Sequence, residues 1–266
     1  MSRTRHRIRV TATAILILIV VIALATAAYF IFFNLGNISS SPLPIPMVSV
    51  ARNWAGYEVA TNFLTPSSAV QNVSASWVVP SVKNSDTNAF SSVWVGIGGQ
   101  FDHTLIQVGT EQDAQNGSAK YYAWYKLLPS NAVTINSIQV SPGDQISASI
   151  STVNSNSNTW AISLQDVTNN QKFQSNFNYN SQQLTAEWIV ERPYFNNALA
   201  ALANFGSVTF TNCQANLSGE TGGITNFSYD SVILDPEIIN NHSVQIVSVS
   251  RPSNGGTQFT VDYVST

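Results

Sequence analysis

The sequence predicts an all-β domain, an antiparallel sandwich of two sheets that is preceded by one N-terminal hydrophobic helix. Short segments in which apolar residues alternate with Ser or Gln recur along the chain, as in 145–150 and 244–249, and this period of two is typical of strands. Turn signals such as Asn116-Gly117 separate these segments. Helical periodicity is nearly absent after residue 50, except in 196–202, where we expect one short helix. Many short strands with frequent turns predict a jelly-roll or concanavalin-like sandwich.

The chain divides into four parts. Residues 1–10 are basic, and residues 11–33 carry no charged side chain, so the second part is predicted to be either a transmembrane anchor or a cleaved signal segment. The basic end should stay in the cytoplasm, which places the rest outside the cell, anchored or secreted. Residues 34–51 are predicted to be a Ser/Pro-rich linker, and residues 52–266 to be the sandwich domain.

Composition narrows the classes of partner. Only 9% of the 266 residues are charged and the net charge is −3, with no basic run after the N-terminus, so nucleic acid is not expected as a partner. A surface of Ser, Thr, Asn and Gln suits an acidic exterior, although an ordinary secreted β protein would have it too. Cys213 is the only cysteine, and its strand-like surroundings predict a structural thiol. The histidines are far apart in sequence, so no metal site and no cofactor are expected.

Two polar side chains interrupt apolar, strand-like segments. Gln107 lies within 105–109, and Glu191 ends 186–191. Further distinctive segments, in chain order, are 53–56, 77–80, 94–97, 123–125, 142–146 and 205–212. Taken together and in this order, the segments resemble those of the glutamic peptidases (eqolisins). The chain is identified from this resemblance as a prokaryotic-type member with an N-terminal membrane segment.

The resemblance implies a specific reaction. It makes Gln107 the catalytic glutamine, Glu191 the catalytic glutamate and Trp94 a substrate-binding tryptophan of the cleft, on a sandwich of two bent antiparallel sheets. The implied activity is that of an acid endopeptidase, with unfolded proteins or peptides as substrates, no cofactor and a monomeric state. Glu191 can serve as general base and then general acid, while the amide of Gln107 can donate to the water and to the oxyanion.

The chain departs from the family pattern in the expected cleft. Fungal eqolisins commonly have acidic residues where this chain has Gly98, Tyr122 and Lys126. The interval from Trp94 to Gln107 is also one residue shorter than in those relatives. These differences concern the charge of the cleft and the substrate preference, and they leave both implied catalytic groups in place.

A glycan-cleaving jelly roll is an alternative for the same carboxylates. Glu187 lies on the same strand face as Glu191, but four residues of strand span about 13 Å. A retaining glycosidase pair needs about 5 Å and an inverting pair less than about 10 Å. A second carboxylate would therefore come from another segment, with Glu111, Asp113 or Asp144 as the candidates.

Two further alternatives involve binding without catalysis. A glycan-binding protein would use exposed aromatic side chains, for which Trp77, Trp124 and Trp160 are the candidates. A non-catalytic cell-surface module would explain the low charge and the Ser/Asn-rich surface. Both alternatives keep the predicted sandwich and the membrane contact through the N-terminal segment, and both differ from the peptidase in needing neither Gln107 nor Glu191.

Overall fold

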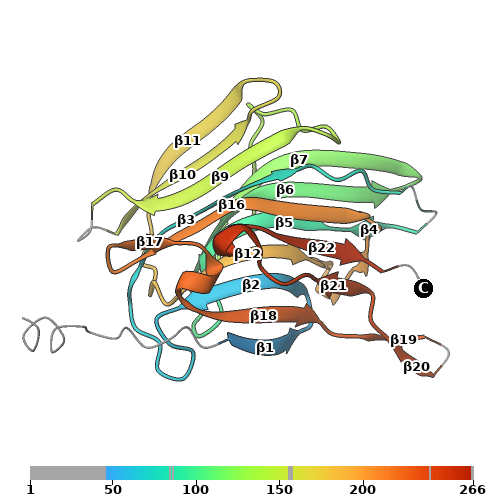
Figure 1. Ribbon diagram of the computed structural model, residues 1–266. Helices are drawn as coiled ribbons and strands as arrows, with labels where there is room; N and C mark the ends of the chain where they lie inside the picture. The colour runs from blue at the N-terminus through green and yellow to red at the C-terminus, as the bar shows by residue number, and fades with distance from the viewer. Residues whose placement is uncertain (1–45, 84, 86, 155–157, 240, 265–266) are drawn as a thin grey trace, which may run out of the picture. The chain divides into compact units, whose positions relative to one another are not determined.

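Two large β-sheets make up the part of the chain that the structure describes (Figure 1). The computed structural model describes residues 46–83, 85, 87–154, 158–239 and 241–264. The predicted N-terminal helix and most of the predicted linker lie outside these residues. Among the described residues, no helix has the length and apolar character needed to cross a bilayer.

The first sheet contains the strands that carry the candidate site. Its order is β1 (Pro46–Ala51), β18 (Ser228–Leu234), β2 (Trp54–Ala60), β12 (Thr185–Glu191), β5 (Ser92–Gly98), β6 (Leu105–Gln115), β4 (Ala89–Phe90) and β15 (Ala201–Leu202). In addition, β7 (Ser118–Leu127) pairs with β6, and β8 (Val133–Thr134) pairs with β7. The pairs β1–β18 and β15–β4 are parallel, and the other pairs are antiparallel.

The second sheet packs against the first. Its order is β11 (Gln171–Asn178), β10 (Thr159–Asp166), β9 (Gln145–Thr152), β3 (Val70–Val78), β16 (Ser207–Leu217), β22 (Phe259–Tyr263) and β21 (Val247–Val249), with β17 (Glu220–Gly222) paired to β16. Two small hairpins and two short 3₁₀ helices complete the described elements: β13 (Tyr194–Phe195) with β14 (Ala198–Leu199), β19 (Glu237–Ile239) with β20 (His242–Val244), η1 (Ile224–Asn226) and η2 (Asn254–Gly256). The prediction of an all-β, two-sheet domain is confirmed.

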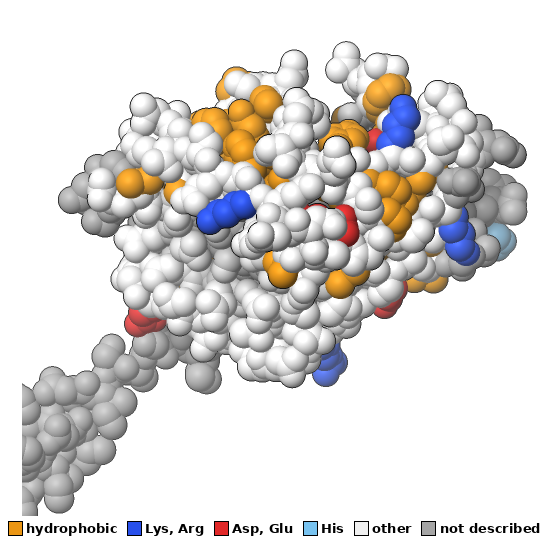
Figure 2. All heavy atoms as spheres, turned by 90° about the horizontal axis from the view of Figure 1, so that it is seen from above, with side chains coloured by type: hydrophobic (Ala, Val, Ile, Leu, Met, Phe, Trp, Pro, Cys, Tyr) orange, Lys and Arg blue, Asp and Glu red, His pale blue; other side chains and the backbone are white. Residues whose placement is uncertain are grey.

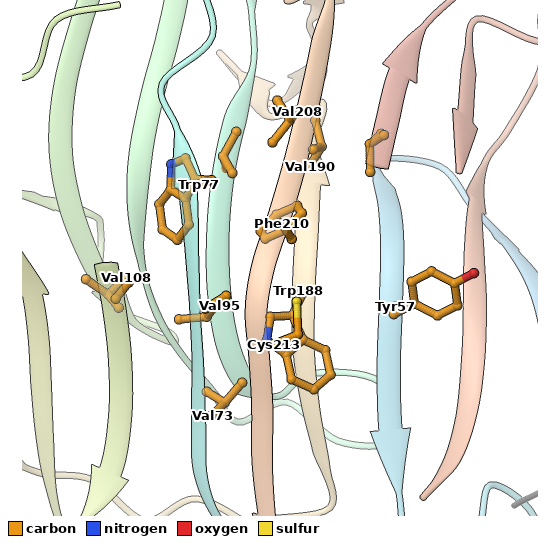
Figure 3. Packing of buried hydrophobic residues seen from close by; sticks show 14 of the residues in the cluster. Tyr57, Val73, Trp77, Val95, Val108, Trp188, Val190, Val208, Phe210 and Cys213 are labelled. Carbon is orange, nitrogen blue, oxygen red and sulfur yellow. The ribbon is translucent and has the colours of Figure 1, made fainter. Parts of the chain in front are cut away.

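The core lies between the sheets and is rich in aromatic side chains (Figure 3). Phe210 and Phe259 stack with ring centroids 4.8 Å apart. Trp188 is fully buried and donates its indole N–H to the carbonyl of Ser74 at 2.9 Å. This bond satisfies the one polar atom of the side chain, which would otherwise be buried without a partner. Cys213 is buried in the same core, and burial raises the pKa of its thiol, so the thiol is unreactive at neutral pH.

The three tryptophans that were candidates for a glycan-binding surface are buried. Trp77, Trp124 and Trp160 are 1%, 5% and 1% exposed, so the expectation that they lie on the surface is wrong. Trp77 donates to the hydroxyl of Thr110 at 3.1 Å across the core. The face drawn in Figure 2 consists largely of uncharged polar side chains and backbone, with few charged groups, as the low charge content predicts.

Two local predictions are wrong. Residues 196–202 form β14 and β15 and no helix, because Asn196 and Asn197 adopt φ angles of 50° and 63° and close the β13–β14 hairpin. Positive φ at both central residues is the requirement of a type I′ hairpin turn, which asparagine tolerates. The end of the predicted linker is also strand, because residues 46–51 form β1, which pairs in parallel with β18.

Candidate active site

Four neighbouring strands of the first sheet, β12, β5, β6 and β7, form the floor of the candidate site. Their register places side chains in three rows across the face that points away from the core. The rows are Glu191–Ser92–Glu111–Tyr122, Ile189–Trp94–Gly109–Trp124 and Glu187–Gly96–Gln107–Lys126. Residues that are far apart in sequence therefore become neighbours through strand pairing alone.

A cavity of about 250 Å³ opens over these rows. It is lined by Ser92, Gln107, Glu111, Tyr122, Trp124, Lys126, Ala132, Glu191, Pro193 and Tyr194. Gln107 and Glu191, which lie 84 positions apart in the sequence, thus line one cavity. The Gln107 amide makes no hydrogen bond to another described residue, so it is available to a ligand.

The Glu191 carboxylate is held by two neutral donors, one on each oxygen. Asn53 donates its amide N–H to Oε1 at 3.0 Å, and Trp94 donates its indole N–H to Oε2 at 2.8 Å. Burial raises the pKa of Glu191, and the bond from Trp94, the charge of Lys126 and the bond from Asn53 oppose that rise. Because both donors are neutral, they orient the carboxylate without cancelling its charge. The ionised carboxylate can therefore act as a base toward the cavity.

Trp94 lies beneath the carboxylate. It is 0% exposed and is not among the residues that line the cavity, so its expected contact with substrate stays a prediction. A Cβ on Gly96 would lie 2.6 Å from Cζ3 of Trp94, so only glycine leaves room for the indole there. The ring of Trp54 meets Trp94 edge-on with centroids 5.1 Å apart. The indole N–H is therefore held in one position under Glu191.

A second carboxyl, Glu111, lies on the cavity wall and was considered from the sequence only as a glycosidase partner. It is 8% exposed and lies between Ser92 and Tyr122 in its row. Burial and the neighbouring Asp113 raise the pKa of Glu111 well above its usual value, and the charge of Glu191 adds to the rise. Glu111 therefore keeps its proton at pH values where Glu191 is ionised. Glu111 lies four residues after Gln107 on the same strand, and an even spacing places both side chains on one face. This spacing could have predicted that Glu111 lies near the site.

The other carboxylates considered from the sequence lie away from the cavity. Glu187 is fully buried beside Glu58, its partner on β2. Asp144 accepts hydrogen bonds from the backbone N–H of Ser141 and the side chain of Asn169, as expected of a turn residue. Within the described part of the chain, no cluster of three or more side chains suited to holding a metal ion is found.

Comparison with known proteins adds to this geometry. Residues 52–263 match the Peptidase A4 family. The chain belongs to the Peptidase A4 family. The predicted resemblance to the glutamic peptidases, or eqolisins, is thereby confirmed at the level of the family. A curated member, aspergillopepsin-2 of Aspergillus niger, is 32% identical over 165 residues, which cover 60% of this chain and 58% of that protein. This Peptidase A4 chain thus matches less than two thirds of the length of that relative.

Solved structures of the family share the fold. Scytalido-glutamic peptidase with a peptide-based transition-state analogue is 25% identical and has a TM-score of 0.65, and the match covers 80% of this chain and 98% of that chain. The eqolisin SCP-B, in a complex with the tripeptide Ala-Ile-His, is 25% identical with a TM-score of 0.62 over the same shares. Aspergilloglutamic peptidase from Aspergillus niger is 29% identical with a TM-score of 0.56, covering 66% of this chain and 99% of that chain.

Proposed function

We propose that this Peptidase A4 chain is an acid endopeptidase in which Glu191 and Gln107 hydrolyse peptide bonds of unfolded proteins. One observation carries the proposal. Glu191, whose two oxygens are fixed by Asn53 and Trp94, opens on the same cavity as the unengaged amide of Gln107. The attack of water on a carbonyl requires a base and a hydrogen-bond donor to the oxyanion. A carboxylate and a neutral amide that face one cavity supply these two groups.

The reaction follows from these two groups. Glu191 takes a proton from a water molecule, whose oxygen then bonds to the carbonyl carbon of the substrate. The amide N–H of Gln107 donates to the oxygen that becomes negative, and because an amide does not titrate it does so at any pH. Glu191 then gives its proton to the leaving nitrogen, the C–N bond breaks, and the carboxylate is restored.

Glu111 supplies a reason for a decline in activity at higher pH. Glu191 must be ionised to act as a base, so activity rises as pH passes its pKa. Glu111 stays protonated through that range because burial and Asp113 raise its pKa. When Glu111 ionises at higher pH, a second negative charge appears on the cavity wall, and it repels the oxyanion that forms as Glu191 takes the proton from water. Activity therefore peaks between the two titrations.

Trp94 acts in this proposal through Glu191. Its N–H sets the direction of Oε2 and stabilises the charged form of the carboxylate. The N-terminal segment supports an extracytoplasmic location, anchored or secreted, and a prokaryotic-type member of the family. A glycan function is the weaker alternative, because the aromatics on which it depended are buried.

The test is digestion of an unfolded protein by the purified full chain from about pH 2 to pH 7, with a chelator present. Glu191→Gln and Gln107→Ala should each lower the rate of cleavage by a large factor. Glu220→Gln and Gln214→Ala, whose side chains are exposed on the second sheet, are the matched controls and should cleave like the wild type. Full activity in either cavity variant would overturn the mechanism, and hydrolysis of polysaccharide without proteolysis would favour the glycan function.

A further inference from the structure

We infer that Lys126 forms an anion subsite in the cavity and selects substrates that place a carboxylate next to the scissile bond. The inference rests on the proposed function and concerns the substrate class of the same cavity. The carboxylate has two sources, an acidic side chain within the substrate or the C-terminal carboxylate of a short peptide.

The position of Lys126 is set by strand pairing. It is the partner of Gln107 in the antiparallel pair β6–β7, so their Cβ atoms lie about 5 Å apart. Both side chains line the cavity. A substrate whose carbonyl oxygen reaches the Gln107 amide therefore passes directly beside the Lys126 ammonium group.

Lys126 is not engaged by a partner within the described part of the chain. The ion pair found there joins Arg192 to Glu237 at 2.7 Å. Glu191 lies close enough for Lys126 to lower its pKa, but the two groups are not within ion-pair distance, and Asn53 and Trp94 already occupy its oxygens.

The remaining groups on the cavity wall leave the ammonium group without a counter-charge. Glu111 holds its proton in acid because burial and Asp113 raise its pKa, and burial raises the pKa of the Tyr122 phenol, which is therefore neutral there. The indole N–H of Trp124, in the row next to Lys126, is buried without an acceptor among the described residues. A substrate carboxylate would supply both the counter-charge and the acceptor that this part of the cavity lacks.

A purely electrostatic role of Lys126 makes a different prediction. If the lysine only lowers the pKa of Glu191, its removal shifts the pH profile equally for every substrate. A subsite changes the ratio of kcat/KM between a substrate with a carboxylate and its uncharged twin. The ratio separates the two roles, because any effect on Glu191 cancels from it.

The ratio should also depend on pH in a defined way. A glutamate side chain of the substrate ionises near pH 4.3. The preference for Glu over Gln should therefore be absent at about pH 3 and reach about tenfold at pH 5 to 6, as expected for one charge-assisted contact in a partly enclosed site.

The experiment uses the full chain and peptide pairs that differ by one Glu-to-Gln exchange at successive positions around one cleavable bond. A second set compares peptides with a free and an amidated C-terminus, which distinguishes the two sources. Lys126→Met should bring the Glu/Gln ratio at pH 5.5 close to one, and Lys126→Glu should invert it. The matched control is Lys120→Met on the same strand, an exposed lysine bonded to Gln115, which should keep the wild-type ratio.

Two results would overturn the inference. One is no carboxylate preference in the wild type at any position or terminus. The other is an unchanged ratio in Lys126→Met, whether or not its pH profile shifts. If no peptide is cleaved at all, the proposed function fails separately. The subsite can then still be tested by measuring the binding of the same peptide pairs through tryptophan fluorescence. Binding depends on recognition of the carboxylate and does not require cleavage. Equal affinity within every pair would end the inference in that case.

Discussion

Glu187 and Glu191 lie on one strand, on one face and four residues apart, yet their surroundings differ completely. Glu191 is half-buried, opens on the cavity and receives a donor on each oxygen. Glu187 is fully buried, and neither of its oxygens has a hydrogen-bond partner among the described residues. Burial raises the pKa of both carboxyls. The charge of Glu58 adds to the rise at Glu187, whereas the bond from Trp94 and the charge of Lys126 oppose the rise at Glu191. The sign of the neighbouring charge and the donor on each oxygen therefore favour Glu191 as the base.

Glu187 belongs to a row of buried carboxyls across β12, β2 and β18. Glu58 pairs with Glu187 on one side and with Asp230 on the other, and the three are 0% or 1% exposed. Burial, together with Asp230, raises the pKa of Glu58 from 4.5 to about 8. Burial and Glu58 raise the pKa of Glu187 well above its usual value. These groups are compatible with the fold only in their protonated, neutral form.

The largest effect we predict is on catalysis, and it contrasts the two glutamates directly. Glu191→Gln should lower kcat by roughly a factor of 1,000, because the general base is lost. Glu187→Gln should retain most of the activity, because an amide replaces a carboxyl that is already neutral. The measurement is kcat at the pH of maximal activity for both variants. Equal losses would mean that Glu187 takes part in the chemistry.

The second prediction concerns stability against pH. Below about pH 4 both the folded and the unfolded chain hold the proton of Glu58, whereas between about 4 and about 8 only the folded chain holds it. Since the folded state then binds more protons, stability is complete in acid and falls as pH rises through this range. Glu58→Gln should flatten the fall and gain on the order of 2 kcal/mol over the wild type at pH 8.

Thermal unfolding followed by circular dichroism from pH 4 to pH 8 measures this effect as a shift of Tm. The exposed Glu220→Gln is the control and should follow the wild-type slope. A slope for Glu58→Gln that equals that of the wild type would show that the row of buried carboxyls does not govern the pH dependence of stability.

The sequence predicted the surroundings of Glu191 better than those of Glu187. Gln107 and Glu191 could be singled out because each interrupts an apolar segment, and their proposed roles come from the resemblance to the glutamic peptidases. Asn53 and Trp94 belong to two of the segments that resemble the family, but the sequence does not show that both donate to Glu191. Their convergence on one carboxylate follows from the pairing of β2, β12 and β5. Long-range register of this kind is not encoded in any local pattern.

The fold was predictable to the same extent. Alternation in β9 and β10 is local, so the strands could be anticipated, whereas the order of strands in each sheet could not. The hairpin after Glu191 was mistaken for a helix because 198–202 suit either element, and the turn at Asn196 and Asn197 decides between them. The row Asp230–Glu58–Glu187 could not be predicted, because its members come from three strands that are distant in sequence. The same is true of the residues that line the cavity.

The third prediction removes one donor from Glu191. Trp94→Phe keeps most of the ring that fills the space above Gly96 and deletes the N–H that binds Oε2. Since that bond lowers the pKa of Glu191, its loss should move the acid limb of the activity profile to higher pH and lower kcat by about tenfold. Trp160→Phe, a buried tryptophan of the second sheet without a bond to Glu191, is the control. An unmoved acid limb would show that the indole serves packing alone.

The smallest effect is predicted for Glu111, which combines features of both glutamates. Like Glu187 it is held protonated by burial and a neighbouring carboxyl, and like Glu191 it lines the cavity. Glu111→Gln imitates the protonated state permanently, so kcat at the optimum should change by less than about threefold, while the decline at higher pH should move to higher pH or disappear. The profile is measured with an uncharged peptide, so that no substrate carboxylate contacts Lys126. If the decline stays where it is in the wild type, the group that limits activity at higher pH lies elsewhere, and the buried row that includes Glu58 becomes the candidate, because its ionisation would unfold the enzyme rather than inhibit it.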